Sequence, residues 1–174
     1  MICPNCGYDN LPGSEECRKC ATSLTPLDVP TPSDRVEKSL MDDVVAGLNP
    51  KAAITVPRSA TVREAVAILL QRDIGALLVV DDQERLVGIF SERDLLARVI
   101  NGRTDNLDRP VEQFMTPKPE TVSPEKSLAF ALGAMDRGGY RHLPVVLNEK
   151  DCIAVGMISV RDMLRHITRL CKSR

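Results

Sequence analysis

The chain has few aromatic residues and no excess of charge of either sign. Its 174 residues include no Trp, two Tyr and three Phe, and the formal net charge is −1. A surface that stacks single-stranded bases on aromatic rings is therefore not expected, and the balanced charge does not favour a protein that coats a polyanion. The 43% hydrophobic and 27% charged residues suit a globular chain.

Signals for membrane insertion or export are also lacking. No apolar run approaches the roughly 20 residues that a membrane-spanning helix needs. The first residues, MICPNC, have neither the charged n-region nor the apolar h-region of a secretory signal. We therefore expect a cytoplasmic protein with reduced thiols and no membrane contact.

Four of the six cysteines lie in the first 20 residues, as two C-x-x-C pairs with ten residues between them. Two tight turns that each present two thiolates form a tetrahedral S₄ cage, which is the geometry that Zn²⁺ accepts. Iron takes the same ligands, so the metal stays open between zinc and iron, with structural zinc as our expectation. The predicted ligands are Cys3, Cys6, Cys17 and Cys20.

Other uses of these cysteines fit less well. Disulfides do not suit a cytosolic chain, and a redox C-x-x-C motif is expected next to a βαβ unit, which is absent around these cysteines. About 24 residues cannot bury enough surface to fold alone, so the metal would supply the folding free energy.

The stretch CPNCGYDNLPGSEECRKC resembles the short zinc ribbons at the ends of many bacterial and archaeal proteins, over residues 1–24. Those ribbons usually read C-P-x-C-G…C-x-x-C-G, and here Ala21 replaces the second glycine. Three acidic and two basic residues, with the net −2 of four thiolates around Zn²⁺, make this module anionic. Phosphate contacts are therefore disfavoured, and we expect protein docking or stabilisation rather than nucleic-acid binding.

Residues 25–32 contain three prolines and are predicted to form an extended linker. A helix should follow, capped by Ser33 or Asp34, because apolar residues recur every four positions from Val36 to Leu48. Gly47 and the Asn49-Pro50 pair should end this helix. We expect it to pack on the domain that follows.

The remainder of the chain is an internal duplication. A shift of 66 places residues 55–80 on 121–146, and beyond a two-residue longer hairpin a shift of 68 places Val87-Gly88 on Val155-Gly156. Neither half is long enough for a robust core, so the two should share one. Each half is predicted to contain a strand, a helix, two strands and a second helix, in that order. In the first half these elements are 53–56, 61–72, 76–80, 86–90 and a helix from 91 to a stop at 101–102. In the second half they are 119–122, 127–137, 142–147, 153–158 and 159–170.

This pattern is similar to a tandem pair of cystathionine β-synthase (CBS) domains, the Bateman module, over residues 33–174. The marks that carry the resemblance are MTPKPETVSP, RHLPVV and a G-x-x-S-x-R-D junction in both repeats. It implies an α/β (α+β) fold of two β-α-β-β-α repeats packed as a pseudo-two-fold pair behind a small Cys₄ ribbon. The predicted boundaries are 33–102 for the first repeat with the leading helix, and 103–174 for the second.

The resemblance also implies a regulatory function without catalysis. Such pairs bind AMP, ADP, ATP or S-adenosylmethionine in clefts between the repeats, often dimerise, and act on a separate protein, whose identity the sequence does not give. No Ser-His-Asp or Cys-His constellation, Walker loop or paired catalytic carboxylates support an enzyme. The alternatives are a structural adaptor with vestigial clefts and, less favoured, a nucleic-acid regulator that uses the ribbon.

The last strand–helix junction is the best candidate for the ligand site. Ser159 would cap a helix whose first amides attract a phosphate, and Asp162 could accept hydrogen bonds from a ribose diol. The alternative is a plain capping box without a ligand. Arg141 and His142 are basic where the first repeat has Gly75 and Ala76, which favours the second cleft, although His142 could also be a surface residue. The predicted set is Val122, Arg141, His142, Pro144, Gly156, Ser159, Arg161 and Asp162, with Ser91 and Asp94 in the first repeat; Val122 and Pro144 would face adenine, Gly156 would permit close approach of the ligand, and Arg161 would neutralise phosphate.

Overall fold

The computed structural model describes residues 2–3, 5–11, 14–24, 32, 34–100, 104–147 and 152–172. The chain forms two compact units, Met1–Asp34 and Arg35–Arg174. Four predicted features lie wholly or partly outside the described residues: Ser33 as a helix cap, the linker apart from Pro32, the helix stop at 101–102, and residues 148–151 of the turn between the predicted strands 142–147 and 153–158. No helix in the described part of the chain is long and apolar enough to cross a bilayer.

The smaller unit consists of two similar loops, each closed by an isolated antiparallel bridge, Ile2 to Asp9 and Glu16 to Ser23. In each loop an amide bonds back to the carbonyl of the first cysteine. The Gly7 N–H donates to Cys3 O at 2.9 Å, and the Ala21 N–H donates to Cys17 O at 2.8 Å. Leu24 is fully buried with Cys3 and Cys17 and forms the only apolar cluster among the described residues of this unit.

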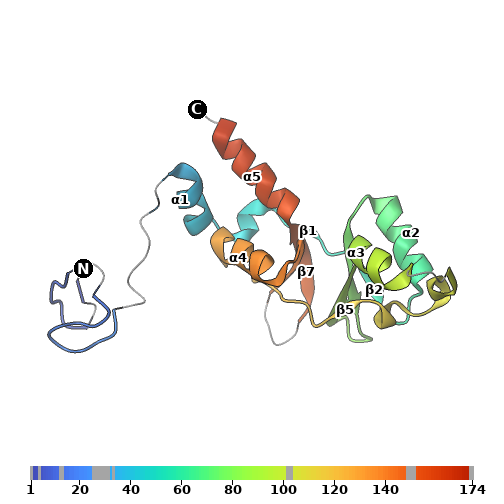
Figure 1. Ribbon diagram of the computed structural model, residues 1–174, viewed down its shortest axis with the longest axis horizontal. Helices are drawn as coiled ribbons and strands as arrows, with labels where there is room; N and C mark the ends of the chain where they lie inside the picture. Colours follow the sequence, from blue (N-terminus) through green and yellow to red (C-terminus); the bar gives the residue numbers. More distant parts are fainter. Residues whose placement is uncertain are drawn as a thin grey trace. The chain divides into compact units, whose positions relative to one another are not determined.

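The larger unit contains two sheets, one for each repeat (Figure 1). The predicted helix after Thr61 is α2, and its capping box is present: the Thr61 side chain accepts from the Glu64 amide, and the Glu64 carboxylate accepts from the Thr61 amide. The first sheet has the order β2 (Thr55–Pro57), β3 (Ala76–Val80), β4 (Leu86–Ser91) and β5 (Thr116–Pro117), with α2 (Val62–Arg72). The second has the order β1 (Lys51–Ala52), β7 (Ala154–Ser159) and β6 (His142–Val146), with α4 (Leu128–Gly138) and α5 (Val160–Lys172).

The predicted helix over 36–48 was wrong in its length, because the chain breaks it in two. Helix α1 (Arg35–Asp42) ends first, and a 3-10 helix, η2 (Val45–Leu48), follows after a break. The break arises because the amides of Val45 and Ala46 bond to the carbonyls of Lys126 and Pro124, both at 2.9 Å. These amides therefore serve the second repeat instead of continuing a helix.

Two other elements differ from the prediction. The last helix of the first repeat starts as α3 (Glu92–Asp94) and continues as a π-helix, η3 (Leu95–Val99). The strand predicted over 119–122 is only an isolated parallel bridge between Val122 and Val145. Between the repeats the chain forms the short 3-10 helices η4 (Thr104–Asp108) and η5 (Val111–Gln113).

The segment that precedes each repeat packs on the other repeat. Strand β1 precedes the first repeat but pairs with β7 of the second, whereas β5 precedes the second repeat but pairs with β4 of the first. The prediction of one core shared by the two halves was wrong, because each repeat has a hydrophobic cluster of its own, completed by the segment that precedes the other repeat. Val45 and Val111, which are equivalent under the shift of 66, are both fully buried, Val45 in the second core and Val111 in the first. The leading helix, which we assigned to the first repeat, accordingly packs on α4 and α5 of the second.

Candidate functional site

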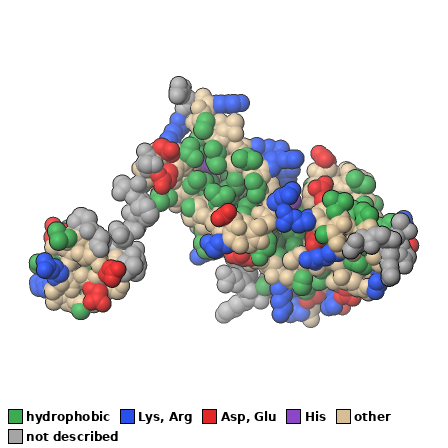
Figure 2. Space-filling model, in the orientation of Figure 1, with side chains coloured by type: hydrophobic (Ala, Val, Ile, Leu, Met, Phe, Trp, Pro, Cys, Tyr) green, Lys and Arg blue, Asp and Glu red, His purple; other side chains and the backbone are tan. Residues whose placement is uncertain are grey.

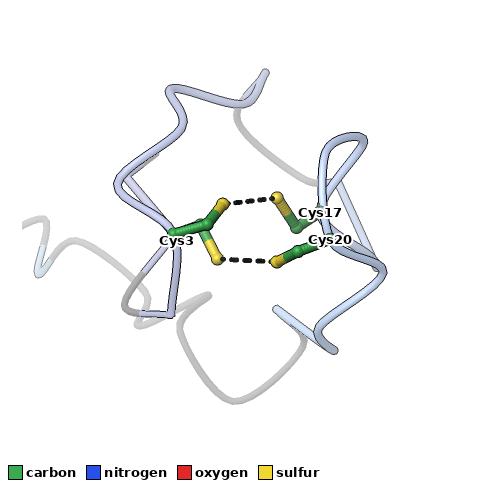
Figure 3. A group of neighbouring side chains, drawn as sticks. Cys3, Cys17 and Cys20 are labelled. Atoms are coloured by element: carbon green, nitrogen blue, oxygen red, sulfur yellow. Dashed lines mark hydrogen bonds between the residues drawn. The ribbon is translucent and has the colours of Figure 1, made fainter.

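The four N-terminal cysteines meet at one point, as predicted. Their sulfur atoms all lie within 4.8 Å of one another. The Sγ atoms of Cys3 and Cys20 are 3.6 Å apart, and those of Cys6 and Cys17 are also 3.6 Å apart, so the two loops face each other sulfur to sulfur (Figure 3). Four sulfurs at about 2.3 Å from a central Zn²⁺ would be about 3.8 Å apart. The cage therefore fits a tetrahedral metal, and it would accept iron as well as zinc.

Hydrogen-bond donors surround two of the sulfurs. The Lys19 amide and the Asn10 side chain approach Cys17 Sγ at 3.4 and 3.6 Å, and the Thr22 hydroxyl lies 3.1 Å from Cys20 Sγ. The bond with Thr22 lowers the pKa of Cys20 to about 6. Such donors stabilise the thiolate form that a metal binds.

One of the four thiols behaves in the opposite way. A hydrogen bond from the Tyr8 backbone lowers the pKa of Cys6, but burial and the three neighbouring cysteines outweigh it and raise that pKa to about 12. Without a cation between them, the four groups therefore do not all ionise at neutral pH. A divalent metal at the centre would remove this penalty, because it compensates the charge of the last thiolate.

A cavity of about 300 Å³ lies between the two repeats of the larger unit, at the small end of the range for small-molecule sites. Figure 2 shows Lys and Arg side chains gathered on this face between the lobe with α4 and α5 and the lobe with α2. Five predicted residues come together here. The lining consists of Lys51, Ala52, Ile54, Asp73, Ile74, Gly75, Glu92, Arg141, His142, Met157, Ile158, Ser159, Val160, Arg161, Asp162 and Arg165.

The other predicted ligand residues do not line this cavity. Val122 and Pro144 are buried and bonded to each other, with the Val122 amide donating to Pro144 O at 3.0 Å. Gly156 serves a strand instead of a ligand: a Cβ at this position would lie 2.9 Å from Lys51 O of β1. Its lack of a side chain is what lets β1 approach β7. Ser91 and Asp94 also lie outside the lining.

Ser159 and Asp162 form one half of the capping box that we considered as the alternative. The Asp162 Oδ2 atom accepts from the Ser159 amide at 2.9 Å and from its hydroxyl at 2.6 Å. The Val160 amide donates to Arg141 O at 3.0 Å, so the first amide of α5 is already bonded within the protein. Asp162, which lines the cavity, has a long contact of 3.5 Å from Arg165 at its other oxygen, Oδ1, so a ligand would meet weak competition there.

His142 links the two repeats. A Cβ on Gly75 would lie 3.2 Å from His142 Cε1 and 3.5 Å from the Glu92 carboxylate, so Gly75 makes room for the imidazole. Burial lowers the pKa of His142; Glu92 and Asp162 oppose this effect, and Arg141 and Arg161 reinforce it. The ring is therefore neutral at pH 7 and could accept a proton when an anion enters.

The sequence did not predict a cluster formed by Ser39, Asp43 and His166 between α1 and α5. The Ser39 hydroxyl donates to the Asp43 carboxylate and lies 2.8 Å from His166 Nε2, which is itself 3.3 Å from Asp43 Oδ2. This is not a catalytic triad, because one nitrogen of the histidine faces both partners and Ser39 is only 9% exposed. The cluster fastens α1 to α5. The i, i+4 spacing of Ser39 and Asp43 was the only sequence signal for it.

The comparisons identify both units. A family model described as the CBS domain matches residues 41–101 and 111–169. The chain belongs to the CBS-domain family. A model for a zinc-ribbon domain matches residues 2–24, so the resemblances noted in the sequence are confirmed for both parts. This CBS pair also confirms the mixed α/β fold, and its structural neighbours are CBS-domain proteins.

Three relatives illustrate the similarity. A 17.7 kDa protein of Acidianus ambivalens is 34% identical over 110 residues, which is 63% of this chain and 64% of that protein. The CBS domain protein PAE2072 from Pyrobaculum aerophilum, complexed with AMP, is 27% identical with a TM-score of 0.62, over 72% of this chain and 98% of that one. The CBS pair of MJ0100, in complex with 5′-methylthioadenosine and S-adenosyl-L-methionine, is 25% identical with a TM-score of 0.61, over 72% and 96%. The chain spans 64% of the Acidianus ambivalens protein and 18% of a CBS domain-containing protein of Arabidopsis thaliana, so it covers less than two thirds of these curated relatives.

Proposed function

We propose that this protein is a non-catalytic regulatory sensor that binds an adenosine-containing ligand in the cleft at Asp162. The observation that carries the proposal is the convergence of Ser159, Asp162, Arg141, His142 and Arg161 on one cavity between the repeats. Related CBS pairs carry AMP, 5′-methylthioadenosine or S-adenosylmethionine. The ligand would join both repeats and thereby change how firmly they are held together, and a partner protein would respond to that change.

The charges of the cleft favour a ligand with phosphate. Lys51, Arg141, Arg161 and Arg165 line it beside His142, against the carboxylates of Asp73, Glu92 and Asp162. Phosphate would bond to the guanidinium groups, while the carboxylate of Asp162 accepts from the ribose hydroxyls. An entering phosphate would also raise the pKa of His142, because it adds negative charge beside a ring whose protonation is held back by burial.

We propose structural zinc for the N-terminal unit, with protein docking as its function. Ile2 and Leu11 are each 69% exposed, which suits a protein partner better than a polyanion. Metal analysis of the purified protein by mass spectrometry should give one zinc per chain. Binding of DNA or RNA that weakens with salt and is lost in a Cys17→Ser variant would contradict this docking role.

Thermal unfolding with AMP, ATP and S-adenosylmethionine tests the sensor. We expect at least one of them to raise the Tm at millimolar concentration. Arg161→Gln should reduce this shift while the ligand-free Tm changes little, because Arg161 is an exposed residue that lines the cleft. A matched control is Arg169→Gln, on the same helix and away from the cavity lining. No shift with any of the three compounds would refute the proposal and favour an adaptor with vestigial clefts. We also propose that the protein is a homodimer, and sedimentation would test this.

A further inference from the structure

The two repeats place equivalent residues in different surroundings. Under the shift of 68, Asp94 corresponds to Asp162 and Arg98 to His166, and under the shift of 66, Thr116 corresponds to Pro50. Both aspartates accept the same pair of bonds from the serine three residues before them: Asp94 Oδ2 accepts from the Ser91 amide at 3.0 Å and from its hydroxyl at 2.6 Å, as Asp162 Oδ2 does from Ser159. The difference lies in the second carboxylate oxygen.

In the first repeat this second oxygen is already occupied. The Thr116 hydroxyl donates to Asp94 Oδ1 at 3.1 Å, and Arg98 Nη1 lies 3.3 Å from the same atom. The Asp94 side chain is 8% exposed, compared with 22% for Asp162. A hydroxyl and a cation are thus bonded to this carboxylate oxygen. The Thr116 hydroxyl occupies the position in which a ribose hydroxyl would donate to an aspartate without internal partners.

The second repeat lacks both of these internal partners, and Asp162 Oδ1 has only the longer 3.5 Å contact with Arg165 Nη1. Pro50 stands where Thr116 would be and has no hydroxyl to donate. His166 replaces Arg98 and is bonded to Ser39, away from Asp162. Arg98 has a further structural task, because it donates to Phe114 O at 3.1 Å and Met115 O at 2.7 Å and so holds the segment that carries Thr116 in place.

The neighbouring arginines differ in the same direction. Arg93 extends to the other repeat and donates to Gly139 O at 3.2 Å, whereas its counterpart Arg161 lines the cavity. The basic pair Arg141 and His142 also has no equivalent in the first repeat, where Gly75 and Ala76 stand. The arginine and aspartate that line the cavity in the second repeat therefore have counterparts in the first repeat that make contacts within the protein.

We propose that Thr116 and Arg98 act as a built-in substitute for ligand in the first repeat, so that each chain binds one nucleotide, in the cleft at Asp162. This inference rests on the proposed function and adds its stoichiometry and the residues that set it. Pro50 and His166 leave Asp162 Oδ1 with only the long contact to Arg165, whereas Thr116 and Arg98 both bond to Asp94 Oδ1.

Calorimetric titration of the full, metal-loaded chain with AMP measures the stoichiometry directly. We expect one AMP per chain, and two per chain would overturn the inference while leaving the proposed function intact. If AMP does not bind at all, both the binding of this nucleotide in the cleft and the inferred stoichiometry are refuted. A wrong stoichiometry and a wrong proposed function would therefore give different results.

A matched pair of isosteric variants assigns the site. Asp162→Asn should weaken AMP binding about 10- to 100-fold, because an amide replaces a charged acceptor for the ribose hydroxyls. Asp94→Asn should leave the AMP affinity within about two-fold and lower the Tm, because it loses its charge next to Arg98. An equal loss of affinity in both variants, or a loss only in Asp94→Asn, would overturn the proposal.

Thr116→Val provides a second route in case Asp94→Asn does not fold. The variant keeps the shape of the side chain and removes only the hydroxyl that bonds to Asp94 Oδ1. We expect a Tm lower by about 2–4 °C with unchanged AMP affinity and stoichiometry. Weaker AMP binding in this variant would mean that the hydroxyl serves the ligand and would overturn the proposal.

Discussion

The zinc ribbon contains the same backbone turn twice, once with glycine and once with alanine. Gly7 and Ala21 each follow the second cysteine of a C-x-x-C pair, and both have a left-handed backbone, with φ of 68° and 53°. Left-handed conformations suit glycine, because a Cβ collides with the following carbonyl there. We predict that Ala21→Gly strengthens metal binding and that Gly7→Ala weakens it.

The magnitude follows from two opposing terms. The left-handed conformation costs an alanine about 1–2 kcal/mol, whereas glycine loses about 0.5–1 kcal/mol more backbone entropy on folding. The balance favours glycine by about 0.5–1 kcal/mol. Steric contacts do not complicate the comparison, because a Cβ on Gly7 would meet no atom within 4 Å and Ala21 is exposed. Since metal binding and folding of the ribbon are coupled, this difference corresponds to about a two- to five-fold change in zinc affinity.

The assay is competition for zinc between the full chain and a chromophoric chelator, followed by absorbance. Ala21→Gly should retain zinc at a higher chelator concentration than the wild type, Gly7→Ala should lose it at a lower one, and the double variant should resemble the wild type. If Ala21→Gly binds zinc no more tightly and Gly7→Ala no less tightly, backbone strain does not limit this site and the reasoning is refuted.

Three further predictions concern the glycines, the histidine and the metal. Gly156→Ala should lower the free energy of unfolding of the larger unit, measured in urea, by about 2 kcal/mol, because the added methyl group meets the backbone carbonyl of Lys51 at 2.9 Å. Gly88→Ala should cost less, because its nearest contacts are with the flexible Met115 side chain. Equal costs for the two variants would contradict this. The pKa of His142 is lowered in the folded protein, so the unfolded chain takes up a proton first as the pH falls; the free energy of unfolding should be at its full value above about pH 6.5 and fall as the pH drops towards the folded-state pKa. Urea midpoints at pH 7.5 and 5.5 should differ for the wild type and differ less for His142→Gln. If the variant loses as much stability as the wild type, another group causes the loss. Removal of zinc by a chelator should broaden the amide NMR signals of residues 2–24 and leave those of the CBS pair in place, and loss of both sets would show that the two units fold as one.

Local signals predicted the individual elements well. Helix α2 was expected from the Thr61 capping box, and strands β3 and β4 from an apolar run, a polar hairpin and a second run; the structure confirms these elements. The cysteine cage was equally predictable, because the C-x-x-C spacing itself brings two sulfurs to each turn. Such features depend on residues close in sequence.

Features that depend on distant partners were not predicted. The apolar period of 36–48 is continuous, yet the helix breaks because amides at Val45 and Ala46 find carbonyls some 80 residues away. Gly156 was interpreted as room for a ligand, whereas it makes room for β1. At the site, Ser159, Asp162, Arg141, His142 and Arg161 line one cavity, and their binding of a ligand stays a prediction. The acids Asp73 and Glu92, which belong to the first repeat, carried no signal of their own.

The exchange of leading segments has a consequence for biogenesis. When the first repeat has left the ribosome, its sheet still lacks β5, and β1 must wait for a partner, β7, that is synthesised about 100 residues later. Such non-local pairing raises the contact order and slows folding. A nascent chain halted between the two repeats would therefore expose unpaired strand edges, and neither repeat would persist as an independent domain if it were expressed without the other.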